Sequence, residues 1–104
     1  MTNMGHLAKQ AIVIQQKMKK VQERMKETRL ESSVGGGMVK VVVNGHSEIL
    51  SISIEKEILK PEEQEMLQDL ILSGVNEALK KADELSKSEM GKIIPQGLSI
   101  PGLF

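Results

Sequence analysis

The chain has 104 residues, with 14 basic and 14 acidic side chains and therefore no formal net charge at pH 7. It contains no cysteine, tryptophan or tyrosine, and its one phenylalanine is Phe104. These numbers predict a single domain over residues 1–104 and exclude disulfide frameworks and thiolate metal sites. A chain of this length buries only about two-thirds of its unfolded surface, so an aromatic-free core is marginal alone. We therefore expect a partner subunit.

Apolar runs in the sequence are short. The longest one near the start, residues 11–14, falls well short of a secretory signal core, and no stretch approaches the length of a transmembrane helix. We therefore expect a cytoplasmic protein that has no membrane partner.

The first segment repeats apolar residues alternately three and four positions apart. These positions are Met4, Leu7, Ala11, Ile14, Met18, Val21, Met25 and Thr28. Such a narrow stripe, with a period of 3.5 residues, predicts a long helix that packs along a partner helix. Asn3 is placed to cap the start of this helix.

Three short segments after the first helix have β character. Residues 30–34 alternate, residues 38–43 are β-branched and nearly continuous, and residues 48–54 alternate with Ile52 and Ile54 on one face. They predict a three-stranded antiparallel meander.

Glycine-rich turns separate these strands. Asn44-Gly45 is a strong hairpin signal between the second and third strands. The run Gly35-Gly36-Gly37 precedes a strand and not a helix, so no helix N-terminus is available there to bind phosphate. We interpret the run as a strand junction that needs positive φ or close backbone approach.

A second helix is predicted from Pro61, which suits a first helical turn, to Gly91, which we expect to end it. Its apolar face is broad and comprises Met66, Leu67, Leu70, Ile71, Gly74, Val75, Ala78, Leu79, Ala82 and Leu85. Residues 94–104 are rich in proline and glycine, and we expect a flexible tail there. The predicted fold is therefore α+β, with the order α-β-β-β-α, a three-stranded antiparallel meander and two long helices.

Catalytic constellations are missing from the sequence. His6 and His46 are the only histidines, and we expect both to have surface roles. Four acids at the start of the second helix complement its positive end rather than form a metal site; they are Glu62, Glu63, Glu65 and Asp69. We expect no enzymatic activity, no cofactor, no metal and no small-molecule substrate.

The first helix is the one candidate binding element. Residues 1–30 carry seven basic and two acidic side chains. Lys17, Lys20 and Arg24 are spaced i, i+3 and i+7 on one face beside the apolar stripe, and Lys19 and Lys26 lie on a neighbouring face. A row of cations on a rigid helix can follow DNA phosphates, although a solvated helix face has the same composition.

The missing aromatic residues restrict the nucleic acid. Proteins that bind single strands or RNA loops stack bases on Phe, Tyr or Trp, and this chain offers none before residue 104. The sequence therefore favours double-stranded DNA held through its backbone. If the first helix is not the site, Lys80, Lys81 and Lys87 of the second helix are the next candidates.

Several separated motifs, in order along nearly the whole chain, closely resemble the YbaB/EbfC family of bacterial nucleoid-associated proteins. They are residues 35–41 (GGGMVKV), Asn44-Gly45, residues 66–71 (MLQDLI), residues 75–81 (VNEALKK), residues 90–92 (MGK) and residues 101–104 (PGLF). The resemblance implies an α+β homodimer whose sheets join and whose helices project like tweezers around DNA. It also implies an effect on gene expression or genome organisation, and a location at the nucleoid. The first helix matches the family in character rather than by motif.

The main alternative is a protein-interaction adaptor. In that reading the heptad stripe of the first helix docks a partner protein, and the charges only keep the chain soluble. Binding to DNA would weaken steeply with salt, whereas apolar docking to a protein would persist in high salt.

Overall fold

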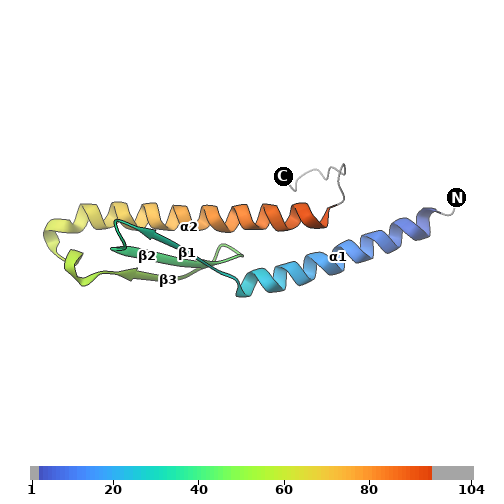
Figure 1. The fold of residues 1–104 in the computed structure, drawn as a ribbon, viewed down its shortest axis with the longest axis horizontal. Helices are drawn as coiled ribbons and strands as arrows, with labels where there is room; N and C mark the ends of the chain where they lie inside the picture. The colour runs from blue at the N-terminus through green and yellow to red at the C-terminus, as the bar shows by residue number, and fades with distance from the viewer. Residues whose placement is uncertain (1–2, 95–104) are drawn as a thin grey trace.

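The computed structural model describes residues 3–94. These residues form helix α1 (Asn3–Glu27), strands β1 (Arg29–Val34), β2 (Val39–Asn44) and β3 (Ile49–Ile54), and helix α2 (Gln64–Ile93). Two short 3-10 turns, η1 (Lys56–Ile58) and η2 (Pro61–Glu63), join β3 to α2. The predicted α+β class and the order α-β-β-β-α are confirmed (Figure 1).

The three strands form one antiparallel sheet in the order β1-β2-β3. Val39, Val41 and Val43 of the central strand are completely buried. The side chains of directly paired residues lie on the same face, so Val41 shares its face with Ser32 on β1 and Ile52 on β3. This face carries the core.

Helix α2 packs on that face through small residues. Ala78 and Ala82 are completely buried, and a Cβ on Gly74 would lie 3.1 Å from Val41 Cγ2. Larger side chains at these positions would push the helix away from the sheet. The broad apolar face predicted for the second helix therefore forms the other half of the core.

Helix α2 does not cover the three strands of the sheet equally. The helix contacts β1 and β2, while β3 keeps three apolar side chains largely exposed: Ile49 at 47%, Leu50 at 43% and Ile52 at 42%. The edge strand β3 therefore presents an apolar surface that α2 does not cover.

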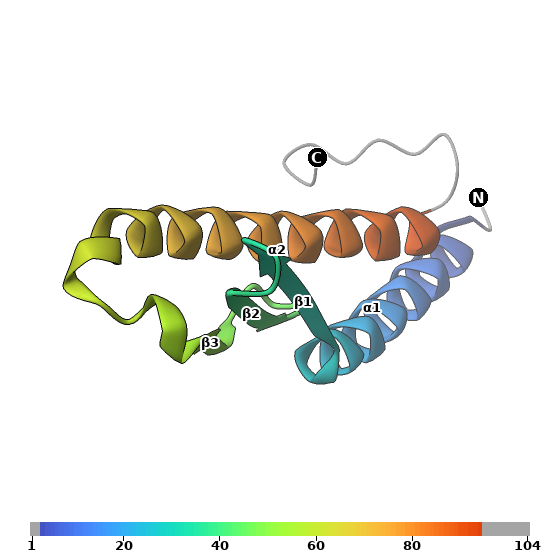
Figure 2. The ribbon, with the colours of Figure 1, turned by 60° about the vertical axis from the view of Figure 1, so that its left-hand side comes forward.

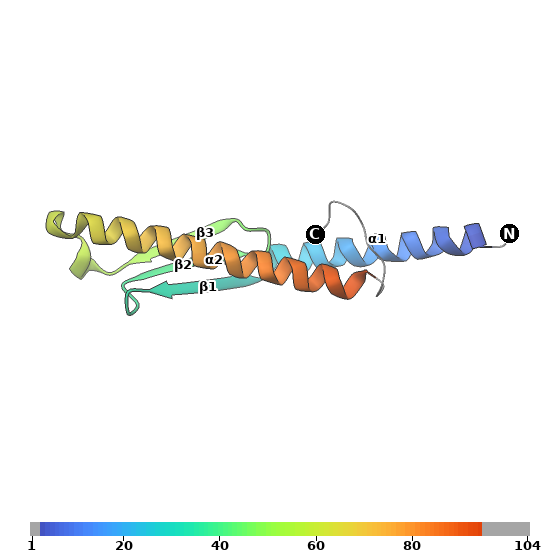
Figure 3. The ribbon, with the colours of Figure 1, turned by 90° about the horizontal axis from the view of Figure 1, so that it is seen from above.

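Within residues 3–94, helix α1 packs against the other elements only near its C-terminal end. Val21 and Met25 are buried against Met90 of α2, with Met18 and Ile93 beside them. Nearer the N-terminus α1 extends beyond α2 (Figure 1 and Figure 3), and Leu7 is 59% exposed. The predicted packing of the apolar stripe along a partner helix is therefore observed only at its C-terminal end.

The β1–β2 turn confirms the interpretation of the glycine run. Gly35, Gly36 and Gly37 have φ angles of 63°, 66° and 94°. Such values lie in a region that residues with a Cβ rarely adopt.

The β2–β3 connection is a hairpin, as predicted, but it is longer than an Asn-Gly turn. Asn44 is the last residue of β2, β3 begins at Ile49, and the positive φ of 62° falls on Ser47. Gly45 is required there for another reason, close approach to α1: a Cβ on it would lie 2.7 Å from Met25 Cβ.

The ends of α2 differ from the prediction. Pro61 opens a 3-10 turn and the α-helix begins at Gln64, while at the other end the helix passes through Gly91 to Ile93. Ile94 leaves the helix with an extended backbone, as expected for a residue that precedes a proline. The predicted flexible tail lies outside the described residues, apart from Ile94. Within residues 3–94, neither helix is apolar enough over a sufficient length to cross a bilayer.

Candidate nucleic-acid interface

Residues 4–17 of α1, which we call the arm, are open to solvent. All of these side chains are exposed except that of Ile14, which is half-buried. Figure 2 shows α1 leaving the sheet at an angle to α2. A ligand can therefore reach the arm from several sides.

The predicted cations divide into two sets around α1. At about 100° per residue, Lys17, Lys20 and Arg24 fall within about 60° of one another. Lys19 and Lys26 lie together on a second flank, about 130° further round the helix. The five residues are all exposed, but no single flat surface contacts all of them.

Lys9 was missed by the sequence analysis. By the same geometry it lies about 20° from Lys20 around the axis, and its side chain is exposed. Lys9 precedes Lys20 by one heptad and one helical turn, so the same spacing extended toward the N-terminus would have included it. We call the side that bears Lys9, Lys17 and Lys20 the basic flank, and Arg24 lies at its inner end.

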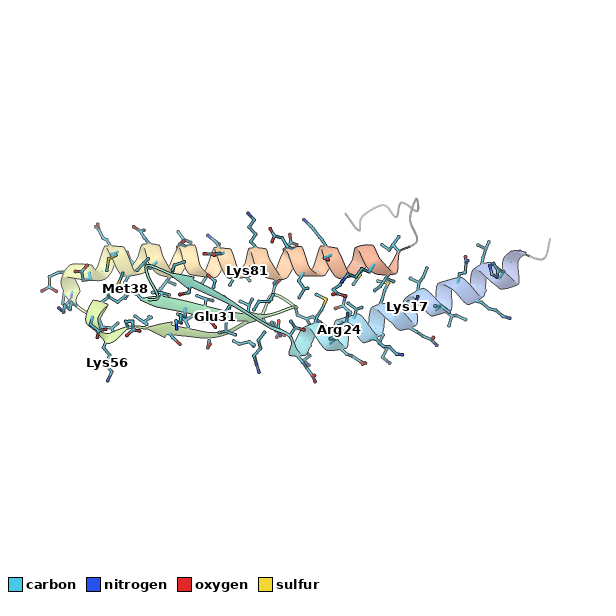
Figure 4. The ribbon with its side chains drawn as sticks, viewed as in Figure 1. Lys17, Arg24, Glu31, Met38, Lys56 and Lys81 are labelled. Carbon is cyan, nitrogen blue, oxygen red and sulfur yellow. The ribbon has the colours of Figure 1, made fainter. Side chains whose placement is uncertain are left out.

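Arg24 already has a partner. Its guanidinium donates a hydrogen bond to Glu89 of α2 at 2.7 Å, and Lys92 Nζ lies 3.5 Å from the same carboxylate. Figure 4 shows Arg24 near the junction with α2 and Lys17 further along α1. Arg24 is thus less available to a phosphate than Lys17 and Lys20.

In contrast, the lysines of the basic flank form no ion pair within the described residues. Their ammonium groups lie on a regular helix whose backbone holds their spacing. An unpaired cation is more readily recruited by an external anion, because no existing pair has to be broken. Lys9, Lys17 and Lys20 are therefore more available than Arg24, and Lys19 and Lys26 on the second flank are likewise unpaired among the described residues.

The lysines of α2 are less available. Lys81 Nζ donates to the backbone carbonyl of Glu31 at 2.7 Å, and Lys87 pairs with Asp83 at 3.1 Å. Figure 4 labels Lys81 on α2 and Glu31 on β1. Of the three second-helix candidates, Lys80 alone has no such bond within residues 3–94. This leaves α1 as the stronger candidate.

Among residues 3–94, no three His, Asp or Glu side chains gather closely enough to hold a metal ion. Of the four acids singled out in the sequence, Glu62 of η2 and Glu65 and Asp69 of α2 are exposed, and Glu63 of η2 is half-buried.

Comparison with known proteins identifies the family of this chain. The model of the YbaB/EbfC DNA-binding family matches residues 1–98. The chain belongs to this family. A YbaB/EbfC relative from Pelotomaculum thermopropionicum, named a nucleoid-associated protein, is 52% identical over 102 residues, which are 98% of this chain and 96% of the relative. One from Bacillus thuringiensis, with the same name, is 49% identical over 98% of this chain and 93% of its own.

The YbaB/EbfC fold is also found among solved structures. A crystal structure of an uncharacterized protein from Helicobacter pylori matches with a TM-score of 0.70 and 28% sequence identity. The match covers 78% of this chain and 94% of the other.

Proposed function

We propose that this protein binds double-stranded DNA as a homodimer through the basic flank of α1, and that it acts at the nucleoid on genome organisation or gene expression without catalysing a reaction. The observation that carries the proposal is the basic flank itself. Lys9, Lys17 and Lys20 are exposed on a projecting helix and have no ion-pair partner among the described residues. Membership of a DNA-binding family supports DNA as the ligand.

Electrostatics favour α1 despite the zero net charge. Eight acidic side chains lie in residues 61–104, against four lysines, whereas residues 1–30 hold seven basic side chains and two acidic ones. Solvent-exposed charges further apart than about 10 Å are largely screened at 0.1 M salt. A phosphate at the arm would therefore experience chiefly the local cations of α1.

Duplex DNA is favoured over a single strand because the site has no aromatic side chain on which a base could stack. Contacts between lysines and phosphates carry little sequence information. We expect similar affinity for unrelated duplex sequences.

The homodimer is supported by the uncovered surface of β3. An edge strand offers unpaired backbone groups, and here Ile49, Leu50 and Ile52 are also exposed. A contiguous apolar surface beside an open edge favours association with a second copy of the chain. Sedimentation or light scattering should give twice 11.5 kDa at micromolar concentration, and a stable folded monomer would contradict the dimer.

The two flanks of α1 supply a matched pair of variants for testing DNA binding. The double variant Lys17→Gln with Lys20→Gln removes two charges from the basic flank, and Lys19→Gln with Lys26→Gln removes two from the second flank. In a dimer the first variant removes four cations, so the slope of log affinity against log salt should flatten by about 3.6. The second should flatten it much less. Equal effects would contradict the choice of flank, and an unchanged slope in both would eliminate α1.

A second candidate function, a protein-interaction adaptor, is favoured by one observation. Leu7 and Met4 of the apolar stripe stay exposed, at 59% and 82%, although DNA phosphates would not use them. Binding of a protein partner that persists in high salt and is lost in Leu7→Lys, together with no retention on duplex DNA, would favour the adaptor.

A further inference from the structure

The β2–β3 turn, residues 45–48, holds the C-terminal end of α1. The backbone N–H of Gly45 donates to the carbonyl oxygen of Met25 at 2.8 Å. Met25 lies in the last turn of α1, where carbonyl groups lack the usual partners within the helix. The turn thus supplies the shorter of two hydrogen bonds to this carbonyl, which also accepts from the backbone N–H of Thr28 at 3.2 Å.

His46 makes a second attachment to the same helix. Its Nε2 lies 2.7 Å from the carbonyl oxygen of Gln22. A carbonyl oxygen can only accept a hydrogen bond, so Nε2 carries the proton and donates it. Gln22 and Met25 are about 4.5 Å apart along the helix axis. Two attachments at different heights resist tilting of the helix, which a single attachment would allow.

The turn is itself internally fixed. The side chain of Asn44 is buried, and its Oδ1 accepts from the backbone N–H groups of His46 at 2.9 Å and Glu48 at 3.1 Å. Its Nδ2 donates to Glu48 Oε1 at 2.7 Å. These bonds hold the backbone of His46, so its imidazole has a fixed base from which to reach α1.

The apolar contact between α1 and α2 does not fix direction equally well. Burial of Val21 and Met25 against Met90 is favourable, but apolar burial is non-directional, and methionine side chains adapt to several packings. The directional restraints on α1 are the hydrogen bonds from the turn and the Arg24–Glu89 ion pair, whose arginine side chain is largely exposed. Only the bonds from the turn are made to the backbone of α1, so we expect them to contribute most to the angle at which α1 leaves the sheet.

We infer that His46 is a positioning residue, which fixes the direction of the arm and thereby the place of the basic flank on DNA. Only the second part of this inference, the place of the basic flank on DNA, rests on the proposed function. Lys9 lies 13 residues from Gln22, or about 20 Å along the axis, so a tilt of about 10° displaces it by about 3.5 Å. That displacement exceeds the tolerance of a hydrogen-bonded phosphate contact.

The first experiment measures the arm directly and needs no DNA. Since the chain has no cysteine, spin labels can be attached at Gln15→Cys on the arm and Ser73→Cys on α2, both exposed positions away from the basic flank. An excess of unlabelled protein isolates the distance within one chain. His46→Ala should broaden this distance distribution and shift it by up to about 2 Å for a tilt of about 10°, because Gln15 lies about 10 Å from Gln22 along the axis. His46→Gln should restore it, because its amide can donate to the Gln22 carbonyl.

The second experiment measures duplex affinity in the same variants. His46→Ala should weaken binding about tenfold and leave the salt slope unchanged, because the same cations remain. His46→Gln should bind like the parent chain. Thermal unfolding monitored by circular dichroism checks that each variant is folded.

Two results would overturn the inference. One is an unchanged distance distribution in His46→Ala. The other is weaker binding with a flattened salt slope and unchanged distances, which would make His46 a DNA contact rather than a positioning residue. A parent chain that binds no duplex DNA contradicts the proposed function, while the spin-label distances still decide whether His46 directs the arm.

Discussion

The guanidinium of Arg24 on α1 and the carboxylate of Glu89 on α2 are joined by a 2.7 Å ion pair, although the residues are 65 positions apart in the sequence. The pair lies beside the apolar contact of Val21 and Met25 with Met90. Arg24 therefore links the two helices, and its charge is already partly neutralised.

Replacing Glu89 with Gln should free Arg24 for DNA. Duplex affinity should rise and the salt slope should steepen by up to about 1.8, one additional phosphate per protomer. Folding stability should fall by no more than about 1 kcal/mol, because the arginine side chain is 61% exposed. Asp83→Asn is the control, since Asp83 pairs with Lys87 within α2. Equal gains in affinity from both variants would indicate a general charge effect rather than release of Arg24.

Gly45 should tolerate no side chain. A Cβ there would lie 2.7 Å from both Cβ and O of Met25, so Gly45→Ala must displace α1 or the turn and should destabilise by about 1–3 kcal/mol. Gly91→Ala is the contrasting case. It lies inside α2, and no atom of the described residues lies within 4 Å of its Cβ position, so alanine should stabilise by about 0.5–1 kcal/mol. Urea unfolding at one protein concentration measures both, and a neutral Gly45→Ala would contradict the close approach.

Gly36 tests backbone conformation separately from packing. Its φ is 66°, and no atom within residues 3–94 lies within 4 Å of its Cβ position, so we expect any penalty to come from the backbone. Gly36→Val should destabilise folding or dimerisation by about 1–3 kcal/mol. Gly36→Asn should cost much less, because asparagine tolerates the left-handed region. Equal melting of the two variants would show that φ at this position does not limit the fold.

Ser32 carries a buried hydroxyl with no hydrogen-bond partner in the described part of the chain. It lies opposite Val41, on the sheet face that α2 covers. Ser32→Ala should stabilise by about 1 kcal/mol, because an unsatisfied polar group no longer has to be desolvated. Ser33→Ala, at the exposed neighbouring position, should change stability little. Loss of stability in Ser32→Ala would point to a partner for this hydroxyl that forms in the dimer.

The exposed apolar side chains of β3 predict where the dimer can be disrupted. Ile52→Glu places a charge on the uncovered apolar surface of β3 and should raise the dimer dissociation constant at least about tenfold. Ser51→Glu, on the opposite face of the same strand, should have a smaller effect. Sedimentation equilibrium over a range of concentrations measures both. A dimer unaffected by Ile52→Glu would exclude this surface as the interface.

Sequence patterns were sufficient for the elements of this fold because their causes are local. The 3.5-residue period of α1, the β-branched run of β2 and the three glycines all act within a few residues, and the structure confirms each element. The end of α2 was misplaced at Gly91. Helix ends depend on what packs beside them, and Met90 and Ile93 on either side of this glycine pack against α1.

The candidate site was only partly visible in the sequence. Charge and helical spacing alone identified Lys17, Lys20 and Arg24, and the same spacing would have included Lys9. The sequence could not show that Arg24 pairs with Glu89, or that His46 bonds to Gln22, because each pair comes together only when distant segments pack.

The sequence by itself determined which elements form, their order, and which helix is basic, since propensity, periodicity and charge are properties of neighbouring residues. The tertiary structure alone decided which cations remain free, where α1 leaves the body, and which strand stays uncovered. Those outcomes depend on contacts such as Gly45 with Met25 and Gly74 with Val41, where side-chain volume and hydrogen-bond geometry act between residues far apart in the chain.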